Sequence, residues 1–301
     1  EEAFQKGCYN ILDLDLASYQ STRNFVKSLK TFKGSKPLDA LVCNAAVYQP
    51  ALSVPKYTGD GHEEQMQINH LSHFLLCNLL LDDIKRSKDG RVVIVGSITG
   101  NSNTVGGGLV YPLADLGLLS GLAKGGKDPI CMVTGEPFNG AKAYKDSKIC
   151  NMMTINELHK RYHDSTGITF SSLYPGCIAT TQLFREKRQW FRKLFPLFMK
   201  YVTGGFVSES EAGERLAQVV SDPRCKKSGV YWSWNGGART VGFIDPRTGK
   251  LTGAGGSGGD LFENDYSNEV KNEKKSNLLW EYSTQITGVK WPAGSGVLAK
   301  A

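Results

Sequence analysis

The sequence predicts an α/β fold built on a doubly wound, mostly parallel sheet. Short apolar runs alternate along the chain with longer stretches of helical periodicity, which is typical of crossover units. The apolar runs end in small or polar residues, among them Asn44, Ser97 and Pro175. Ligands of such sheets bind beyond the carboxyl ends of the strands, so we expect a site where these residues meet.

Three elements are predicted in the first part of the chain. A strand covers Cys8 to Leu12 and leads to Asp15, and a second, buried strand covers Asp39 to Ala46 and runs into small residues. Apolar residues at helical spacing predict a helix from Gly61 to Arg86, with Asn69 near its middle. The apolar positions of this helix are Met66, Leu71, Phe74, Leu75, Leu79 and Leu80.

Two more strands are predicted in the middle of the chain. One runs from Gly90 to Ser97, and the other runs from Gly167 to Tyr174 and stops at Pro175-Gly176. Residues 101–139 between them are rich in glycine. A loop of this length inside a compact domain is usually a lid or a binding element, so we expect this insertion to contribute to a ligand site.

Residues 141–151 have the pattern of a helix that carries Tyr144 and Lys148 on one face. We expect the Lys148 charge to favour the phenolate and to lower the Tyr144 pKa from its ordinary value of about 10. A phenol tuned in this way can protonate a group that receives a hydride. Short pairs of this kind also arise by chance, and a solvated helix face is the alternative.

Taken in this order, the motifs resemble the short-chain dehydrogenase/reductase family, which implies a Rossmann-like fold. The resemblance implies that Asn69, Ser97, Tyr144 and Lys148 are the catalytic four. It also implies that Lys148 holds the nicotinamide ribose and that Asn69 supports a water relay to Lys148. The cofactor-binding residues implied are Asp15, Asn44, Ala45, Tyr144, Lys148, Pro175, Gly176, Ile178 and Thr180.

Longer segments resemble a light-dependent branch of this family that reduces a tetrapyrrole. They are Val42–Pro50, Val95–Asn101, Gly140–Lys148, Ser172–Thr181 and Gly229–Asn235. The resemblance covers about Cys8 to Asn235 and resumes weakly near Ser267 to Gly288. It implies reduction of protochlorophyllide to chlorophyllide after light excites the pigment, with NADPH as the hydride source, in plastid chlorophyll biosynthesis.

The residue that supplies the proton is left open by the sequence. The resemblance implies Tyr144, but Cys177 directly follows Gly176, and a thiol with an ordinary pKa near ~8.5 could also protonate a carbanion. Buried cysteines are more often inert packing. We expect Thr99 to hydrogen-bond the substrate, and Ser97 fits either the family's catalytic serine or a turn.

An aromatic and basic amphipathic segment, Leu183 to Tyr201, is termed here the lid segment. Such a segment can cover a flat apolar ligand, lie on an anionic thylakoid-type membrane surface, or mediate self-association into a homo-oligomer. A helix packed on the core with solvated lysines is the alternative, and Pro196 should bend or end the helix. Its aromatic and basic residues are Phe184, Arg185, Lys187, Arg188, Trp190, Phe191, Arg192, Lys193, Phe195, Phe198 and Lys200.

The family's amino-terminal βαβ unit, with its Thr-Gly-x-x-x-Gly-x-Gly turn that binds the pyrophosphate, is missing from these 301 residues. In a sheet ordered 3-2-1-4-5-6 this leaves an apolar edge unpaired. We expect this chain to bind NADPH poorly or not at all, and we expect restoration of the unit to recover the affinity in a titration. Residues that select NADPH over NADH usually lie in that unit, so NADPH rests on the resemblance.

Composition sets the outer bounds. With 301 residues, 40% of them hydrophobic, we expect a single Rossmann-like domain over residues 1–301, with insertions at 101–139 and 236–266 and a tail at 289–301. A small hairpin is predicted over Phe243 to Leu251. The net charge of +7 suits phosphate-bearing cofactors and anionic lipid and does not indicate nucleic acid. Seven cysteines without metal-ligand spacing indicate reduced thiols and no metal site.

Two other functions fit the same residues. A conventional carbonyl reductase of this fold would work in darkness and would place a different cargo under the 101–139 insertion. A non-catalytic pigment-binding protein would keep the fold without a working dinucleotide site. The joint presence of Asn69, Tyr144 and Lys148 argues against the pigment-binding protein, because a scaffold has no need of that set.

Overall fold

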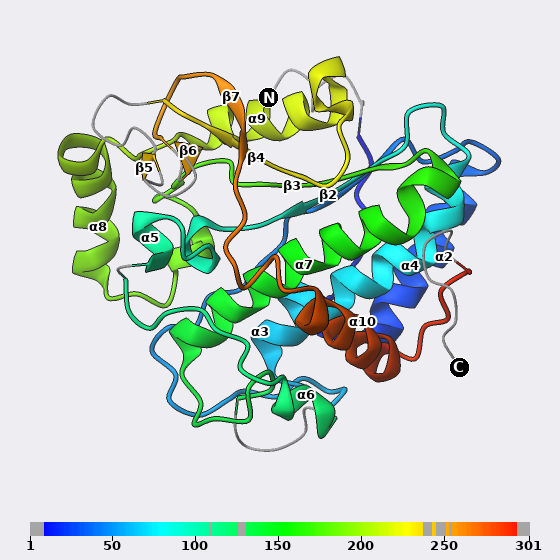
Figure 1. Cartoon of the computed structure of the whole chain (residues 1–301), viewed down its shortest axis with the longest axis horizontal. Coiled ribbons are helices and arrows are strands. Elements are labelled where there is room, and N and C mark those ends of the chain that lie inside the picture. The colour runs from blue at the N-terminus through cyan, green and yellow to red at the C-terminus, as the bar shows by residue number, and fades with distance from the viewer. Residues whose placement is uncertain are drawn as a thin grey trace.

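A five-stranded sheet forms the centre of the computed structural model, which describes residues 9–108, 110–125, 131–236, 243–244, 251–252 and 255–293. Helices cover the sheet, with α4, α7 and α10 on one side and α9 on the other (Figure 1). The strand order is β1-β2-β3-β4-β7. The strands are β1 (Ala40–Cys43), β2 (Arg91–Val95), β3 (Thr169–Leu173), β4 (Val230–Trp234) and β7 (Leu261–Asn264).

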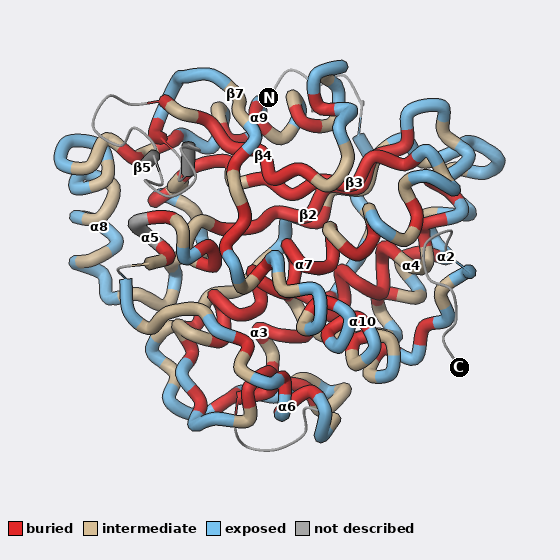
Figure 2. Tube along the Cα trace, in the orientation of Figure 1, coloured by how far each residue is buried: buried red, intermediate tan, exposed pale blue. Residues whose placement is uncertain are grey.

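The first four of these strands are parallel and β7 is antiparallel to β4, which confirms the predicted α/β class with a mostly parallel sheet. β2, β3 and β4 are buried along their whole length (Figure 2). β1 is an edge strand, and three of its four residues are only half-buried. No described strand pairs with its outer side, in agreement with the open edge expected from the sequence.

The strand predicted over Cys8 to Leu12 is wrong for the described residues of that segment. Residues 9–12 form no strand, and Ile11 is 82% exposed. A strand needs a neighbour for its backbone N–H and C=O groups, and none of the described strands lies beside this segment. The apolar pattern therefore predicted a strand where the described chain offers no neighbouring strand to pair with.

The longer helices are α2 (Tyr19–Lys33), α4 (Ser72–Lys85), α7 (Gly140–Thr166), α9 (Glu209–Ser221) and α10 (Glu273–Thr287). The predicted helix over Gly61 to Arg86 is present, but it is composed of α3 (Glu64–Met66), a π-helical turn over Gln67–Leu71, and α4. α7 begins where the Asn139 side chain accepts a hydrogen bond from Lys142 N and ends at Gly167, whose φ is 71°.

The insertions and the lid segment contain short elements. The 101–139 insertion contributes α5 (Val105–Gly108) and α6 (Ser120–Ala123), and the predicted hairpin appears as β5 (Phe243–Ile244) paired with β6 (Leu251–Thr252). In the lid segment α8 (Gln189–Leu197) contains Pro196 and ends one residue later, where a π-helical turn (Phe198–Thr203) follows, as expected for a proline. The remaining turns are 3₁₀ helices over Ile98–Gly100, Gln182–Phe184 and Pro223–Lys226.

Among the residues that the structure describes, no helix combines the length and the apolarity needed to cross a bilayer.

Candidate active site

The candidate site lies beyond the carboxyl ends of the parallel strands, where the sequence placed it. Asn44 follows β1 directly, Ser97 follows β2 by two residues, and Pro175 follows β3 by two residues. α7 crosses this edge with its first turns and packs against β2 and β3. The N-terminal half of α7 therefore brings Tyr144 and Lys148 to the strand ends.

The phenol of Tyr144 is buried, with 9% of the residue exposed. Its ring lies 4.8 Å, centroid to centroid, from the ring of Tyr48. Burial raises the Tyr144 pKa well above its ordinary value, and a hydrogen bond with the Ser97 side chain opposes this rise in part. The expected lowering of this pKa by Lys148 is wrong, because desolvation dominates and the lysine is not among the groups that shift it.

Lys148 faces the strand edge instead of the phenol oxygen. Its Nζ donates to the backbone carbonyl of Val95 at 3.0 Å and lies 5.8 Å from the centroid of the Tyr144 ring. Burial lowers the Lys148 pKa to about 8. The amine is therefore close enough to neutrality to exchange a proton near physiological pH.

Burial of Lys148 predicts a stability that depends on pH. The pKa is about 8 in the folded protein against an ordinary 10.5, so between these values the unfolded chain binds more protons than the folded one. The contribution of Lys148 to the free energy of unfolding should therefore rise as pH rises through this window. Lys148→Met should lose that rise, which urea unfolding of both proteins at pH 7 and pH 10 would measure. Identical pH dependence of the two proteins would contradict the assignment.

Asn69 lies in the π-helical turn of Gln67–Leu71 and is completely buried. Its Oδ1 accepts from Val47 N at 2.8 Å, and its Nδ2 donates to Val47 O at 3.0 Å and to Ser147 Oγ at 3.1 Å. One amide thus fixes both backbone groups of Val47 and the residue before Lys148. Asn69 orders the loop that carries Tyr48, a role that the sequence did not indicate.

Ser97 and Thr99 form a small hydroxyl pair at the end of β2. Their side-chain oxygens are 2.8 Å apart, and Thr99 N donates to Ser97 Oγ at 3.2 Å. Ser97 also hydrogen-bonds the Tyr144 side chain. The sequence left Ser97 either as the family's catalytic serine or as a turn residue. The two roles are compatible, because its hydroxyl both accepts from Thr99 N in the turn and hydrogen-bonds the Tyr144 side chain.

The loop after β3 comes close to the exit of the lid segment. Gly176 has a φ of 119°, and a Cβ at this position would lie 2.3 Å from Val207 Cγ2, so glycine is required here. Cys177 O accepts from Val207 N at 3.0 Å. Burial raises the pKa of the Cys177 thiol to about 12, which keeps it protonated. Ile178 is half-buried, and exposed Thr180 donates from Oγ1 to Glu209 Oε1 at 3.1 Å.

Asp15 lies outside the cluster formed by Tyr144, Ser97 and Lys148. Its carboxylate accepts from Ala17 N at 2.9 Å and closes a turn before α2. Asn44 and Ala45 are exposed beyond β1. These three positions leave polar and backbone groups at the surface, which fits a role in contacting an extended ligand.

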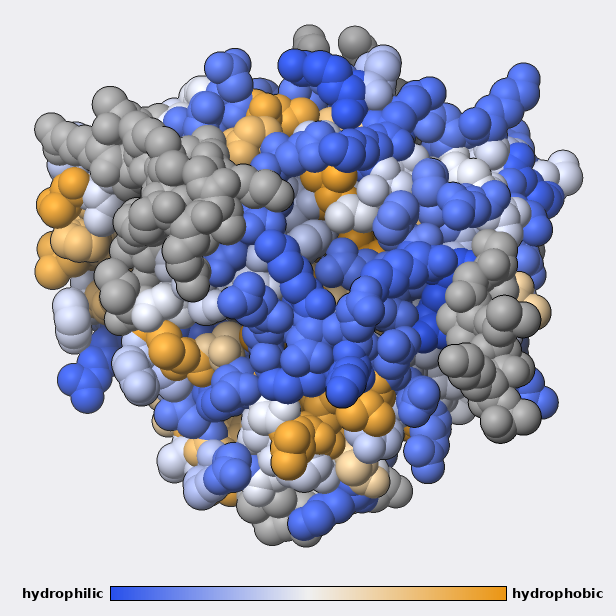
Figure 3. Space-filling model, in the orientation of Figure 1, coloured by the Kyte–Doolittle hydropathy of each residue, from blue (hydrophilic) through white to orange (hydrophobic). Residues whose placement is uncertain are grey.

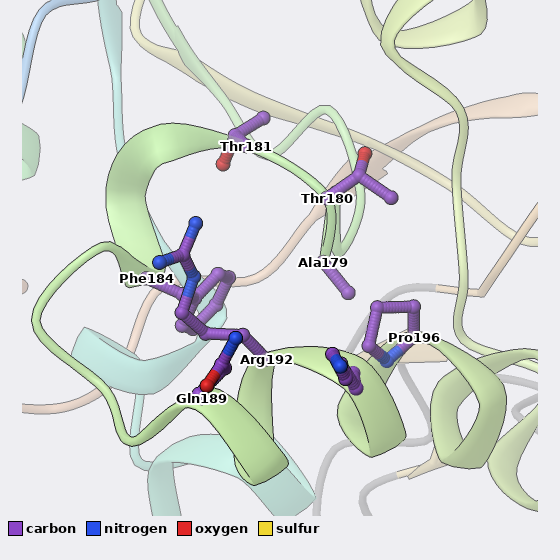
Figure 4. Close-up of a pocket in the computed structure, with 8 residues that line it drawn as sticks. Ala179, Thr180, Thr181, Phe184, Gln189, Arg192 and Pro196 are labelled. Atoms are coloured by element: carbon purple, nitrogen blue, oxygen red, sulfur yellow. The ribbon is translucent and has the colours of Figure 1, made fainter.

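A cavity of about 320 Å³ lies between the loop after β3 and α8 (Figure 4). Phe184 forms part of its wall, and the Phe184 ring meets the Tyr48 ring edge-on at 6.2 Å. Because Tyr48 in turn contacts Tyr144, only one aromatic ring separates the cavity wall from the phenol. The lining residues are Ala179, Thr180, Thr181, Phe184, Gln189, Arg192, Lys193 and Pro196.

Tyr48 and Lys187 were not predicted as site residues. Tyr48 contacts the Tyr144 ring, and the Lys187 amine lies 5.5 Å from the Tyr48 ring centroid. The available signal for Tyr48 was its place just after a strand end at the ligand-binding edge. Lys187 belonged to a predicted basic segment, and only the folded chain shows which lysine of that segment reaches the site.

The residues present fit a reduced pyridine dinucleotide. The close approach of Gly176 to Val207 fixes the backbone of the loop after β3, Lys148 places a buried donor beneath the strand ends, and Asn44 leaves an exposed amide. This arrangement suits a hydride donor held beside a proton donor.

The short chain dehydrogenase family profile matches residues 2–117. Among curated relatives, protochlorophyllide reductase B of Hordeum vulgare is 51% identical over 288 residues, which are 94% of this chain and 67% of the relative. The enzymes of Chlamydomonas reinhardtii and Arabidopsis thaliana are each 52% identical over 94% of this chain, covering 66% and 65% of their own lengths. The chain thus spans about two thirds of these relatives.

Solved structures support the fold. A putative uncharacterized protein of Mycobacterium paratuberculosis is 20% identical with a TM-score of 0.59, over 94% of this chain and 77% of the other. An aldohexose dehydrogenase of Thermoplasma acidophilum is 12% identical with a TM-score of 0.50, over 74% and 75%. The strand-end cluster and the extended identity lead to one conclusion: the chain belongs to the protochlorophyllide reductases of the short-chain dehydrogenase family.

Proposed function

We propose that this chain carries out the light-driven, NADPH-dependent reduction of protochlorophyllide to chlorophyllide in plastid chlorophyll biosynthesis. The observation that carries the proposal is the buried group of Tyr144, Ser97 and Lys148 at the strand ends. It lies in a chain that is about half identical to named reductases of this pigment over 94% of its length.

The proton that completes the reduction comes from Tyr144. Its raised pKa keeps the O–H intact at neutral pH, so the phenol is available as an acid when a neighbouring carbon becomes negatively charged. As the O–H bond breaks, the Ser97 hydrogen bond stabilises the phenolate. Lys148, with a pKa of about 8 and its amine 5.8 Å from the Tyr144 ring centroid, is a buried group that can exchange a proton with the site near neutral pH. Cys177 remains the rival acid, since its thiol is also protonated.

NADPH supplies the hydride when it is bound. Lys148 would hold the nicotinamide ribose from beneath, and the backbone of Pro175 to Cys177 would face the nicotinamide ring. Asn44, Ala45, Ile178 and Thr180 would line the same path, and Asp15 would contact the adenine side. This chain's part in the hydride step is to orient the donor and to exclude water from the strand ends.

The pigment is flat and apolar and carries an acidic side group. The lid segment suits such a ligand, because Phe184, Phe191 and Phe195 form a connected set of rings whose contacts begin at Tyr48. Thr99, half-buried beside Ser97, would hydrogen-bond the pigment. Arg192 and Lys193 line the cavity and are exposed, so they would pair with the carboxylate at its mouth.

Arg192→Gln and Lys193→Gln are each expected to raise the KM for the pigment by about fivefold, because exposed charge pairs contribute up to ~1 kcal/mol. The rate of reduction at saturating pigment should not change. Lys200→Gln is the matched control, since this residue belongs to the same segment, is exposed and does not line the cavity. Equal KM values for all four proteins would show that the pigment carboxylate binds elsewhere.

The outer face of the lid segment suits an internal membrane surface. Trp190, Leu194 and Phe198 are each at least half exposed, and apolar atoms gather over α8 at the left edge of Figure 3. We expect vesicles that contain anionic thylakoid lipid to float the protein, and Trp190→Ser with Phe198→Ser to reduce flotation severalfold. Sedimentation of both proteins without lipid separates this role from self-association, which the same substitutions would then abolish.

A flash experiment tests the proposed function. Full-length protein is mixed with NADPH and protochlorophyllide in darkness, and absorbance is recorded before and after one flash. Chlorophyllide that forms only after the flash supports the proposal. Dark reduction of a carbonyl would indicate the conventional reductase, and a spectral shift without turnover would indicate a pigment-binding protein.

A further inference from the structure

Arg215 of α9 is a buried cation that holds several backbone segments at once. Only 4% of the residue is exposed. Its Nη1 donates to Pro175 O at 2.8 Å, and its Nη2 donates to Gly256 O and Gly258 O, both at 2.9 Å. Nη2 also pairs with Glu211 Oε1 at 2.7 Å. One guanidinium therefore joins the loop after β3, α9 and the second half of the glycine-rich insertion.

The insertion also contacts the backbone just after the lid segment, at residues 204–206. A Cβ on Gly256 would lie 1.8 Å from Gly204 O, so backbone meets backbone at the exit of the lid segment. Ser257 N donates to Phe206 O at 3.0 Å. Phe206 forms a parallel bridge with Cys177, whose O accepts from Val207 N. Residues 255–258, 204–207 and 175–177 thus lie side by side, with Arg215 on one side of the set.

Glu211 connects these contacts further. Its Oε1 accepts from Gly258 N at 2.7 Å as well as from Arg215, and its Oε2 accepts from Ser257 Oγ at 2.5 Å. A buried guanidinium needs acceptors for its donors, and two of those acceptors are carbonyls of the insertion. If these carbonyls moved away, the guanidinium would lose two hydrogen-bond acceptors, and its hydrogen bond to Pro175 O would be less well fixed.

We infer that Arg215 is a positioning residue for the Pro175–Cys177 loop and that residues 255–258 of the insertion hold Arg215 in place. Through Arg215, the insertion sets the affinity for NADPH. The inference rests on the proposed function only in taking NADPH as the cofactor. Residues 255–258 act through Arg215 and through the backbone at residues 204–207. This gives residues 255–258 a function in cofactor binding at a distance from the chemistry.

Titration of NADPH into full-length protein, in darkness and without pigment, tests this inference. Gly256→Ala pushes the insertion away from Gly204, and Arg215→Lys keeps the charge while losing the planar fork. Each is expected to raise the Kd for NADPH about tenfold, the loss of one well-placed charged hydrogen bond. At saturating NADPH, the rate of reduction after a flash should stay within twofold of wild type, which a general loosening of the fold would not allow.

Two further variants serve as controls. Arg224→Met removes an exposed arginine that pairs with Asp222, and it should leave the Kd unchanged. Ser257→Ala removes only the hydroxyl bond to Glu211 and should raise the Kd about threefold, so it keeps the test open if Gly256→Ala fails to fold. Folded Arg215→Lys and Ser257→Ala proteins with the wild-type Kd would overturn the inference. Wild-type protein that binds NADPH but reduces no pigment would instead sink only the proposed function.

Discussion

Tyr144→Phe is expected to slow proton transfer after the flash by about 10²- to 10⁴-fold, the usual contribution of a positioned acid. The substitution removes a single oxygen and leaves the ring contact with Tyr48 in place. Pigment binding and hydride transfer should therefore persist, and an intermediate that awaits its proton should accumulate. Time-resolved absorbance after a single flash separates the two steps.

Tyr48→Phe is the matched control, because it removes the same atom from the adjacent ring. It should leave the second step within a few-fold of wild type. An unaltered second step in Tyr144→Phe would transfer the donor role to Cys177 or to water. Cys177→Ser then decides between these, since a serine hydroxyl is a far weaker acid than a thiol.

Gly176→Ala is expected to lower the free energy of unfolding by about 3 kcal/mol, combining positive-φ strain with overpacking. The added methyl carbon would lie 2.3 Å from Val207 Cγ2, at a φ of 119°. Relief of this clash requires the Pro175–Cys177 backbone to move, so the affinity for NADPH should fall as well. Urea unfolding and an NADPH titration measure the two effects.

Gly167→Ala provides a control for Gly176→Ala. Gly167 follows α7 in the αL region with a φ of 71° and has open space around its Cβ position, so its substitution should cost only the backbone strain, about 1 kcal/mol. Val207→Ala removes Cγ2 but keeps Cβ, which would lie 2.7 Å from the added methyl, so it should relieve the clash in part. We therefore expect Gly176→Ala with Val207→Ala to cost less than the sum of the two single substitutions. Strict additivity would show that packing against Val207 is not the cause.

The local patterns of the sequence predicted three of the five strands of the described sheet, and β4 and β7 were not predicted. Apolar runs predicted β1, β2 and β3, and the i to i+4 spacing placed Tyr144 and Lys148 on one helix at the strand ends. These features depend on neighbours in the chain. The strand expected over Cys8 to Leu12 failed because pairing depends on a distant partner.

The electrostatic prediction failed for a similar reason. Tyr144 and Lys148 do lie on one helix, but burial raises the Tyr144 pKa, and the Lys148 ammonium donates to the Val95 carbonyl. The contact of Tyr48 with Tyr144 and that of Arg215 with Pro175 also join residues far apart in the sequence. Sequence spacing gives the side on which a group lies, whereas the desolvation of that group is a property of the whole fold.

The π-helical turn at Gln67–Leu71 carries one surplus residue relative to a regular α-helix. Each residue of an α-helix advances the azimuth by about 100°, so removing this bulge would rotate the Asn69 amide away from Val47. The two hydrogen bonds between Asn69 and the Val47 backbone depend on this bulge. Shortening this stretch by one residue would turn the Asn69 amide away and leave both backbone groups of Val47, the neighbour of Tyr48, without these hydrogen bonds.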